Sequence, residues 1–272
     1  RKTPLLKSNT FTSMAGTNIF LKMESFQKTG SFKVRGAYSK INSLTVDQCK
    51  SGVVAASAGN HAQGVAYAAQ KRKIRCSIVM PKNASPAKVA ATRSYGANVI
   101  LSGNTYDESW ETAYSLSGEN GYSIIHAFDD PVVIAGQGTI GLELIEDLSD
   151  IDTIYLPLGG GGLASGVCIA VKAKRPDVKI IGVESNQFPA MKKSLEKRRS
   201  CHIEGGFSIA DGISVKSPGE LTFEICSKYL DDVVTVDDVA IVETMFTLME
   251  REKVVVEPAG AASLAYVLSS GK

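Results

Sequence analysis

The chain has 272 residues and 44% hydrophobic content, which is enough to bury one large core or two adjoining ones. A net charge of +2 offers no basic surface for nucleic acid or an acidic membrane, and no apolar run approaches the ~18 residues of a membrane span. The five cysteines are scattered and form no C-x-x-C pair. They indicate reduced thiols in the cytoplasm, and they argue against a disulfide scaffold or a metal site.

The first half of the chain alternates predicted strands and helices. A short helix follows Thr45, which forms a capping box with Gln48, and another begins with Ser85 as N-cap. Strands are expected at residues 18–23, 53–56, 77–81, 98–101 and 123–125, and longer helices at 62–70, 86–95 and 106–117. This rhythm predicts a parallel sheet with both faces covered.

The second half repeats the rhythm after a boundary at residues 129–131. A long helix is expected over 132–148, interrupted near Gly136 and Gly138. A strand at 154–158, a helix at 164–174, a strand at 179–183 and a further helix follow. The α/β pattern predicts a large domain of residues 1–51 and 130–272, with a small domain of residues 52–129 inserted into it.

One lysine lies in an unusual setting. Lys33 stands between Phe32 and Val34, just after a turn and near a predicted helix start. Most lysines are solvated surface charges. A buried ammonium between apolar neighbours is easier to deprotonate, and a neutral amine can form a Schiff base with a carbonyl cofactor.

A second stretch raises the significance of Lys33. Gly159, Gly160, Gly161 and Gly162 stand between a predicted buried strand and a predicted helix. Consecutive glycines let the backbone fold closely around a phosphate and present N–H groups to it, with a helix N-terminus behind. A lysine for an aldehyde and a cradle for a phosphate together predict pyridoxal 5′-phosphate (PLP).

Six segments in order resemble one family: residues 30–37 around Lys33, 57–64, 135–139, the tetraglycine loop, 210–212 and 256–260. The chain resembles the fold-type II PLP enzymes, which are tryptophan synthase β-like, and within them the threonine/serine dehydratase and serine racemase group. The resemblance implies two α/β domains, each a parallel sheet with helices on both faces, and a cofactor in the cleft between them.

The resemblance also implies residue roles. Lys33 would bind PLP covalently and act as the base at the substrate Cα, Phe32 would pack on the cofactor ring, and Asn60 would bond its 3′-oxygen. Gly159, Gly160, Gly161, Gly162 and Leu163 would hold the phosphate, with Gly212 and Glu257 near the cofactor. Ser57, Ala58, Gly59, Asn60 and His61 would hold the substrate carboxylate.

Plainer interpretations stand beside these roles. Ser57 and Asn60 are residue types that commonly cap helices, and His61 is the type of residue found in a first helical turn. Neither His126 nor His202 has a recognisable partner in the sequence.

The resemblance implies β-elimination of a small amino acid: L-threonine to 2-oxobutyrate and ammonia, with L-serine to pyruvate as a secondary reaction. It further implies a cytoplasmic homo-oligomer, a dimer or tetramer, in amino-acid metabolism such as isoleucine biosynthesis. Serine racemase is the first alternative. Its proton-donating serine is replaced here by Ala58, and although Glu184 matches one metal ligand, Ala190 stands where an aspartate is expected.

Three further alternatives stay open. The first is a truncated PLP-binding form without activity. Relatives continue into a final strand with a Ser or Cys that bonds the pyridine nitrogen, whereas this sequence stops at residue 272. A β-replacement synthase of the same fold fits the contexts of Lys33 and residues 210–212 less well. A dinucleotide-binding protein fits the glycine-rich loop but leaves Lys33 and Asn60 unexplained.

Overall fold

The computed structural model describes residues 1–270 and forms two compact units. The first unit comprises Arg1–Ser25 and Gly138–Lys272, and the second comprises Phe26–Gln137. These limits differ from the predicted domains of 1–51 with 130–272 and 52–129, because α2 (Lys33–Asn42) packs closely on α4 (Asn60–Arg72). Within residues 1–270, no helix has both the length and the apolar character needed to cross a membrane.

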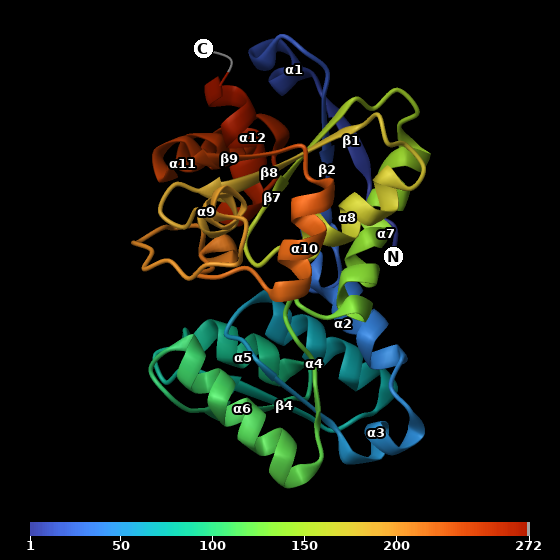
Figure 1. Ribbon diagram of the computed structural model, residues 1–272, viewed down its shortest axis with the longest axis vertical. Coiled ribbons are helices and arrows are strands. Elements are labelled where there is room, and N and C mark those ends of the chain that lie inside the picture. Colours follow the sequence, from blue (N-terminus) through green and yellow to red (C-terminus); the bar gives the residue numbers. More distant parts are fainter. Residues whose placement is uncertain (271–272) are drawn as a thin grey trace. The chain divides into compact units, whose positions relative to one another are not determined.

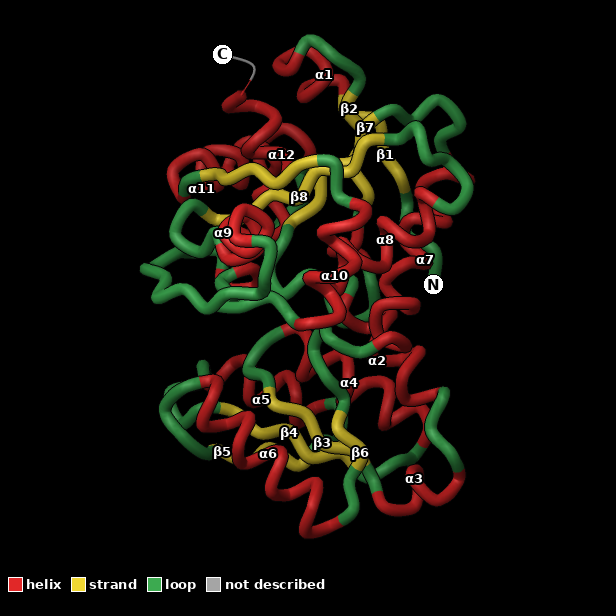
Figure 2. Tube along the Cα trace, viewed as in Figure 1, coloured by secondary structure: helices red, strands yellow, loops and turns green. Residues whose placement is uncertain are grey.

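The second unit is built on a four-stranded parallel sheet in the order β5-β4-β3-β6 (Figure 2). Alternating residues of β3 point to opposite faces. Val53 and Ala55 share a buried cluster with residues of α2, α4 and α5, while Val54 and Ala56 pack against α6. The strands are β3 (Val53–Ala56), β4 (Cys76–Met80), β5 (Asn98–Leu101) and β6 (Ser123–Ile124), and the remaining helices are α3 (Val46–Ser51), α5 (Pro86–Ser94) and α6 (Tyr106–Asn120). The short helix η1 (Glu24–Phe26) has residues in both units.

The first unit contains a three-stranded parallel sheet in the order β7-β8-β9 and an antiparallel pair of β1 and β2. Helices α11 and α12 share a buried cluster with Val183 and Val236 of the sheet, and α8 packs on β7 and on α10 (Figure 1). Its strands are β1 (Leu5–Ser8), β2 (Ile19–Lys22), β7 (Thr153–Pro157), β8 (Lys179–Ser185) and β9 (Asp232–Val236). Its helices are α1 (Asn9–Ala15), α8 (Gly162–Lys172), α9 (Ala190–Lys197), η2 (Asp211–Ile213), α10 (Glu220–Tyr229), α11 (Asp238–Thr247), η3 (Leu248–Glu252) and α12 (Pro258–Ser270), and α7 (Pro131–Asp147) has residues in both units.

The predicted α/β class, the parallel sheets and the Thr45 capping box are confirmed. The predicted interruption of the long helix is wrong, because α7 runs continuously from Pro131 to Asp147. Its glycines serve close packing instead. A Cβ on Gly136 would lie 2.6 Å from the Cα of Gly36, and one on Gly138 would lie 2.8 Å from the carbonyl oxygen of Gly166.

The predicted cap at Ser85 needs a correction. Ser85 does occupy the N-cap position of α5, but its side chain makes no capping hydrogen bond. Pro86 at the first helical position starts the helix through its fixed φ, so the hydroxyl is not required.

Candidate active site

Lys33 is the first residue of α2 and is half-buried. Its Nζ donates a hydrogen bond to the carbonyl oxygen of Ala127 at 2.9 Å and lies 5.5 Å from the centroid of the Phe32 ring. Helix α4 packs directly on this turn, since a Cβ on Gly64 would lie 3.2 Å from the carbonyl carbon of Lys33. The amine is therefore positioned by an aromatic ring, a backbone carbonyl and a tightly packed helix.

The turn between β3 and α4 contains the residues predicted to bind the substrate carboxylate. Gly59 is the N-cap of α4, with no side-chain capping bond, and the Ser57 hydroxyl accepts a hydrogen bond from the Gly59 N–H at 3.1 Å. The N-cap position of α4 is thus occupied by Gly59, and by neither Ser57 nor Asn60. The partial positive charge of a helix N-terminus favours an anion near this turn.

His61, in the first turn of α4, is buried. Its Nε2 lies 2.8 Å from the carbonyl oxygen of Ile125, and because a carbonyl can only accept, Nε2 carries the hydrogen. Its buried Nδ1 makes no hydrogen bond within residues 1–270. Burial, with a smaller contribution from the charge of Lys33, lowers the pKa of His61 to about 3. The imidazole is neutral at physiological pH and fixes the start of α4 to the end of the sheet.

His126 and His202 do have partners, contrary to the sequence-based expectation. The Nδ1 atom of His126 accepts hydrogen bonds from the N–H groups of Phe128 (3.2 Å) and Asp129 (2.7 Å). Its ring meets Trp110 and Phe128 edge-on. His126 therefore shapes the segment that presents the Ala127 carbonyl to Lys33. His202 is exposed, and its Nδ1 lies 3.1 Å from the hydroxyl of Ser217.

The tetraglycine loop leads into the N-terminus of α8 with Gly161 as N-cap. Gly161 has a φ of +93°, and a Cβ there would lie 2.8 Å from the Cβ of Thr222, so both conformation and space demand glycine. Within the described residues, the N–H groups of Gly160 to Leu163 donate to no protein acceptor. Free N–H groups at a helix N-terminus fit a phosphate.

The other predicted cofactor residues of the first unit lie beside this loop. A Cβ on Gly159 would lie 3.1 Å from the Cα of Ile213 in η2, and one on Gly212 would lie 3.0 Å from the Cβ of Ala259 in α12. Glu257 directly precedes α12. The first unit thus brings three separate motifs together, and the second unit contains Lys33, Phe32 and residues 57–61.

Glu184 is fully buried at the end of β8. Its carboxylate oxygens accept hydrogen bonds from the N–H groups of Met191 (2.7 Å) and Lys192 (3.0 Å), at the start of α9. Burial raises the pKa of Glu184 to about 7, although these N–H groups favour its charged form. Glu184 therefore caps a helix, and within residues 1–270 no three His, Cys, Asp or Glu side chains gather as a metal ion requires.

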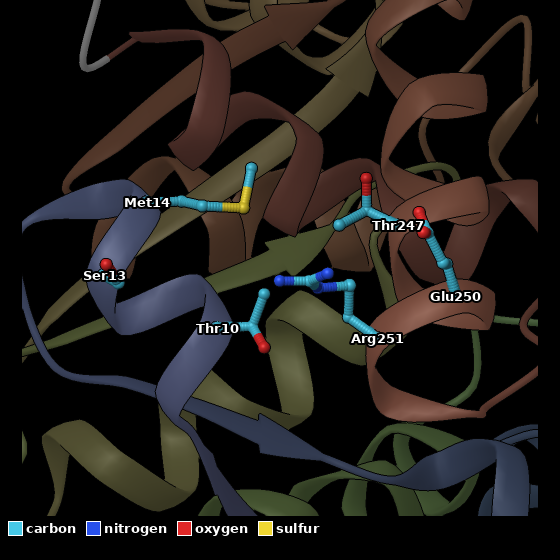
Figure 3. A pocket seen from close by; sticks show the side chains of 6 residues that line it. All are labelled: Thr10, Ser13, Met14, Thr247, Glu250 and Arg251. Atoms are coloured by element: carbon cyan, nitrogen blue, oxygen red, sulfur yellow. The ribbon is translucent and has the colours of Figure 1, made fainter.

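A pocket of about 310 Å³ lies in the first unit between α1 and η3. Figure 3 shows the Arg251 side chain pointing from η3 toward Thr10 of α1. The lining residues are Thr10, Ser13, Met14, Thr247, Glu250 and Arg251. None of them is a predicted site residue.

Two residues that contact the predicted site residues, Ala127 and Thr222, were not predicted from the sequence. Ala127 contributes a backbone carbonyl, which no side-chain pattern reveals. Thr222 stands in the first turn of a helix after Pro218 and Gly219, which is a recognisable helix start. Its contact with Gly160, 62 residues away in sequence, could not be read from that signal.

The family model for "Pyridoxal-phosphate dependent enzyme" matches residues 1–272. The chain belongs to this family. It is 51% identical over 268 residues to the L-threonine ammonia-lyase of Thermotoga maritima. The matched region covers 98% of this chain and 67% of that protein.

Two solved structures are similar to the chain. The processed form of threonine deaminase isoform 2 from Solanum lycopersicum has a TM-score of 0.97 and 37% identity, over 100% of this chain and 75% of that one. Maize serine racemase has a TM-score of 0.96 and 39% identity, over 98% of this chain and 81% of that one. The chain is a fold-type II PLP enzyme, and both the predicted family and its cofactor are confirmed.

Proposed function

We propose that the chain is a PLP-dependent L-threonine ammonia-lyase that converts L-threonine to 2-oxobutyrate and ammonia, with L-serine to pyruvate as a secondary reaction. The observation that carries the proposal is the Lys33 amine, placed beside the Phe32 ring in a chain 51% identical to an L-threonine ammonia-lyase.

The residues that would hold the cofactor fall into two sets. Gly159, Gly160, Gly161, Gly162 and Leu163 would bind the phosphate through their N–H groups, with Gly212 and Glu257 near the cofactor. Phe32 would pack on the ring, Asn60 would bond the ring 3′-oxygen, and Lys33 would bind the aldehyde carbon. The free N–H groups and the left-handed Gly161 support the phosphate role.

The substrate carboxylate binds at residues 57–61. The N-cap of α4 is Gly59, which makes no side-chain capping bond, and the partial positive charge of a helix N-terminus favours an anion. His61 contributes no proton, since its one N–H donates to Ile125. Its contribution is to hold the turn in place.

Lys33 performs the proton transfer. When bound, PLP supplies an electron sink for the pair left on Cα. Once the substrate amine has displaced Lys33 from the aldehyde carbon, the Lys33 amine would take the Cα proton, and the β-hydroxyl would leave as hydroxide and be protonated to water. Release and hydrolysis of the resulting enamine would give the 2-oxo acid and ammonia. The Ala127 carbonyl holds the amine in place by accepting one of its hydrogens.

Serine racemisation is the second candidate, because maize serine racemase shares the fold at a TM-score of 0.96. It requires a proton donor on the opposite face of Cα. Ala58 has only a methyl group at the position of the racemases' serine, and Glu184 is committed to α9. These two observations support elimination.

Assembly and location form a separate part of the proposal. Five free cysteines support a reducing compartment such as the cytoplasm. Val239, Phe246 and Met249 are exposed along α11 and η3, and they support self-association as a dimer or tetramer. Sedimentation of the purified chain tests the second point, and a monomer at every concentration would contradict it.

The function is tested by incubating the purified chain and PLP with L-threonine and, separately, L-serine. We expect 2-oxobutyrate from threonine at a higher kcat/KM than pyruvate from serine, with no D-serine. D-serine as the main product would favour the racemase instead. Formation of neither oxo acid would contradict the proposal.

A further inference from the structure

The tetraglycine loop rests on a buried threonine of α10. Thr222 is 0% exposed, and its hydroxyl lies 2.7 Å from the carbonyl oxygen of Gly160, to which it donates. The same hydroxyl lies 3.2 Å from the carbonyl oxygen of Gly219, at the start of its own helix. One side chain therefore ties the loop backbone to the start of α10.

This hydrogen bond fixes the orientation of a peptide group. A trans peptide is planar and carries its C=O and N–H on opposite edges, and within the described residues no peptide is cis. Because the Gly160 carbonyl points at Thr222, the Gly161 N–H points away from α10. That N–H donates to no protein acceptor within the described residues, so it is available to a ligand.

The contact is tight enough to make the hydroxyl hard to replace. A Cβ on Gly161 would lie 2.8 Å from the Thr222 Cβ and 3.0 Å from the Met191 Cε, so the loop lies directly on these side chains. Gly160 is buried as well. Without the hydroxyl, its carbonyl would lose its donor in a place closed to water, and the peptide would be free to turn.

We propose that Thr222 is a positioning residue for the cofactor phosphate, because its hydroxyl holds the peptide between Gly160 and Gly161 with the N–H directed at the phosphate. The proposal rests on the phosphate role of the tetraglycine loop. Thr222 does not touch the reacting atoms. It sets the affinity for the phosphorylated cofactor.

Titration with PLP and with pyridoxal, which has the aldehyde but no phosphate, separates this role from a general effect on the fold. We expect Thr222→Val to raise the Kd for PLP about tenfold, which corresponds to the loss of about one buried hydrogen bond. The Kd for pyridoxal should stay within about twofold. Thr222→Ser keeps the donor and should bind both as the unaltered chain does.

Matched variants complete the experiment. Thr92 is also buried and donates to a backbone carbonyl, that of Lys88, but it lies in the other compact unit. Thr92→Val should change neither Kd. Thr222→Ala removes the hydroxyl without adding bulk and should reproduce the loss of PLP affinity.

Three outcomes would overturn the inference. The first is an unchanged ratio of the two Kd values in Thr222→Val and Thr222→Ala. The second is a failure of both variants to fold without cofactor, since the hydroxyl would then serve the fold. The third is that the unaltered chain binds PLP no more tightly than pyridoxal. That result would also contradict the proposed role of the tetraglycine loop in binding the phosphate.

Discussion

The Nζ of Lys33 donates to the carbonyl oxygen of Ala127 at 2.9 Å, which joins the first turn of α2 to the segment that follows β6. The Ala127 carbonyl carries no full charge, and a hydrogen bond of this kind contributes about 1 kcal/mol net to stability.

Lys33→Ala should abolish turnover and the near-visible absorbance of the bound cofactor, with a loss of about 1 kcal/mol in unfolding free energy. Absorbance spectra and urea unfolding measure the two effects. Lys40→Ala is the control on the same helix. Lys40 pairs with Asp130 at 2.6 Å, and its loss should leave the cofactor band in place. A band retained in Lys33→Ala would remove Lys33 from the chemistry.

His61 makes stability depend on pH. Burial, and secondarily the Lys33 charge, lowers its pKa from 6.5 to about 3, so the folded chain binds fewer protons than the unfolded chain between these values. Its contribution to stability is complete near pH 7 and declines as the pH falls below about 6.5. By pH 5 the loss should reach about 2 kcal/mol.

Urea unfolding at pH 7 and pH 5 tests this expectation. In His61→Gln, an amide that does not titrate replaces the imidazole, and the part of the pH-dependent loss due to His61 should disappear. His202→Gln, on the surface, should behave as the unaltered chain. Equal losses in all three chains would show that His61 is protonated without cost in the folded state.

Glu184→Gln should lower the unfolding free energy by about 1–2 kcal/mol at pH 8, because the amide presents one donor where two N–H groups need acceptors. Chemical denaturation measures the change. Glu196, exposed on the same helix, gives the control Glu196→Gln, which should cost little. If Glu184→Gln costs no more than its control, the carboxylate does not stabilise α9.

Ala58→Ser should introduce measurable racemisation of L-serine, since it returns a hydroxyl to the position from which a proton can be given back to Cα. Chiral chromatography of the reaction mixture detects D-serine, with the unaltered chain as control. If the variant still forms oxo acids at a normal rate but makes no D-serine, the methyl group at residue 58 is not what withholds racemisation.

Much of the architecture could be predicted from the sequence, because it depends on local signals. The signals are the alternation of short apolar strands with helices, the Thr45 capping box and the glycine-rich turn. Each of them determines the structure of only the few residues around it. Helix α7 shows the limit of such reasoning. Gly136 and Gly138 weaken a helix by propensity, but both serve close packing against residues far away in sequence.

The candidate site shows the same limit. Lys33 and the tetraglycine loop could be recognised in the sequence by residue type, and the order of the motifs identifies the family. The bond from Lys33 to the Ala127 carbonyl and the bond from the Thr222 hydroxyl to Gly160 each join a side chain to main chain far away in sequence, and His126 accepts from two nearby main-chain N–H groups. Such contacts leave no periodicity or motif, so only the folded chain reveals them.

The measurement that tests the central claim most directly is the absorbance spectrum of the purified chain with PLP, before and after L-threonine is added, with 2-oxobutyrate assayed in the same tube. We expect a near-visible cofactor band that changes on addition of threonine, together with 2-oxobutyrate. A band without product would indicate a PLP-binding chain without activity. The absence of any band would contradict the assignment of Lys33 and the tetraglycine loop to the cofactor.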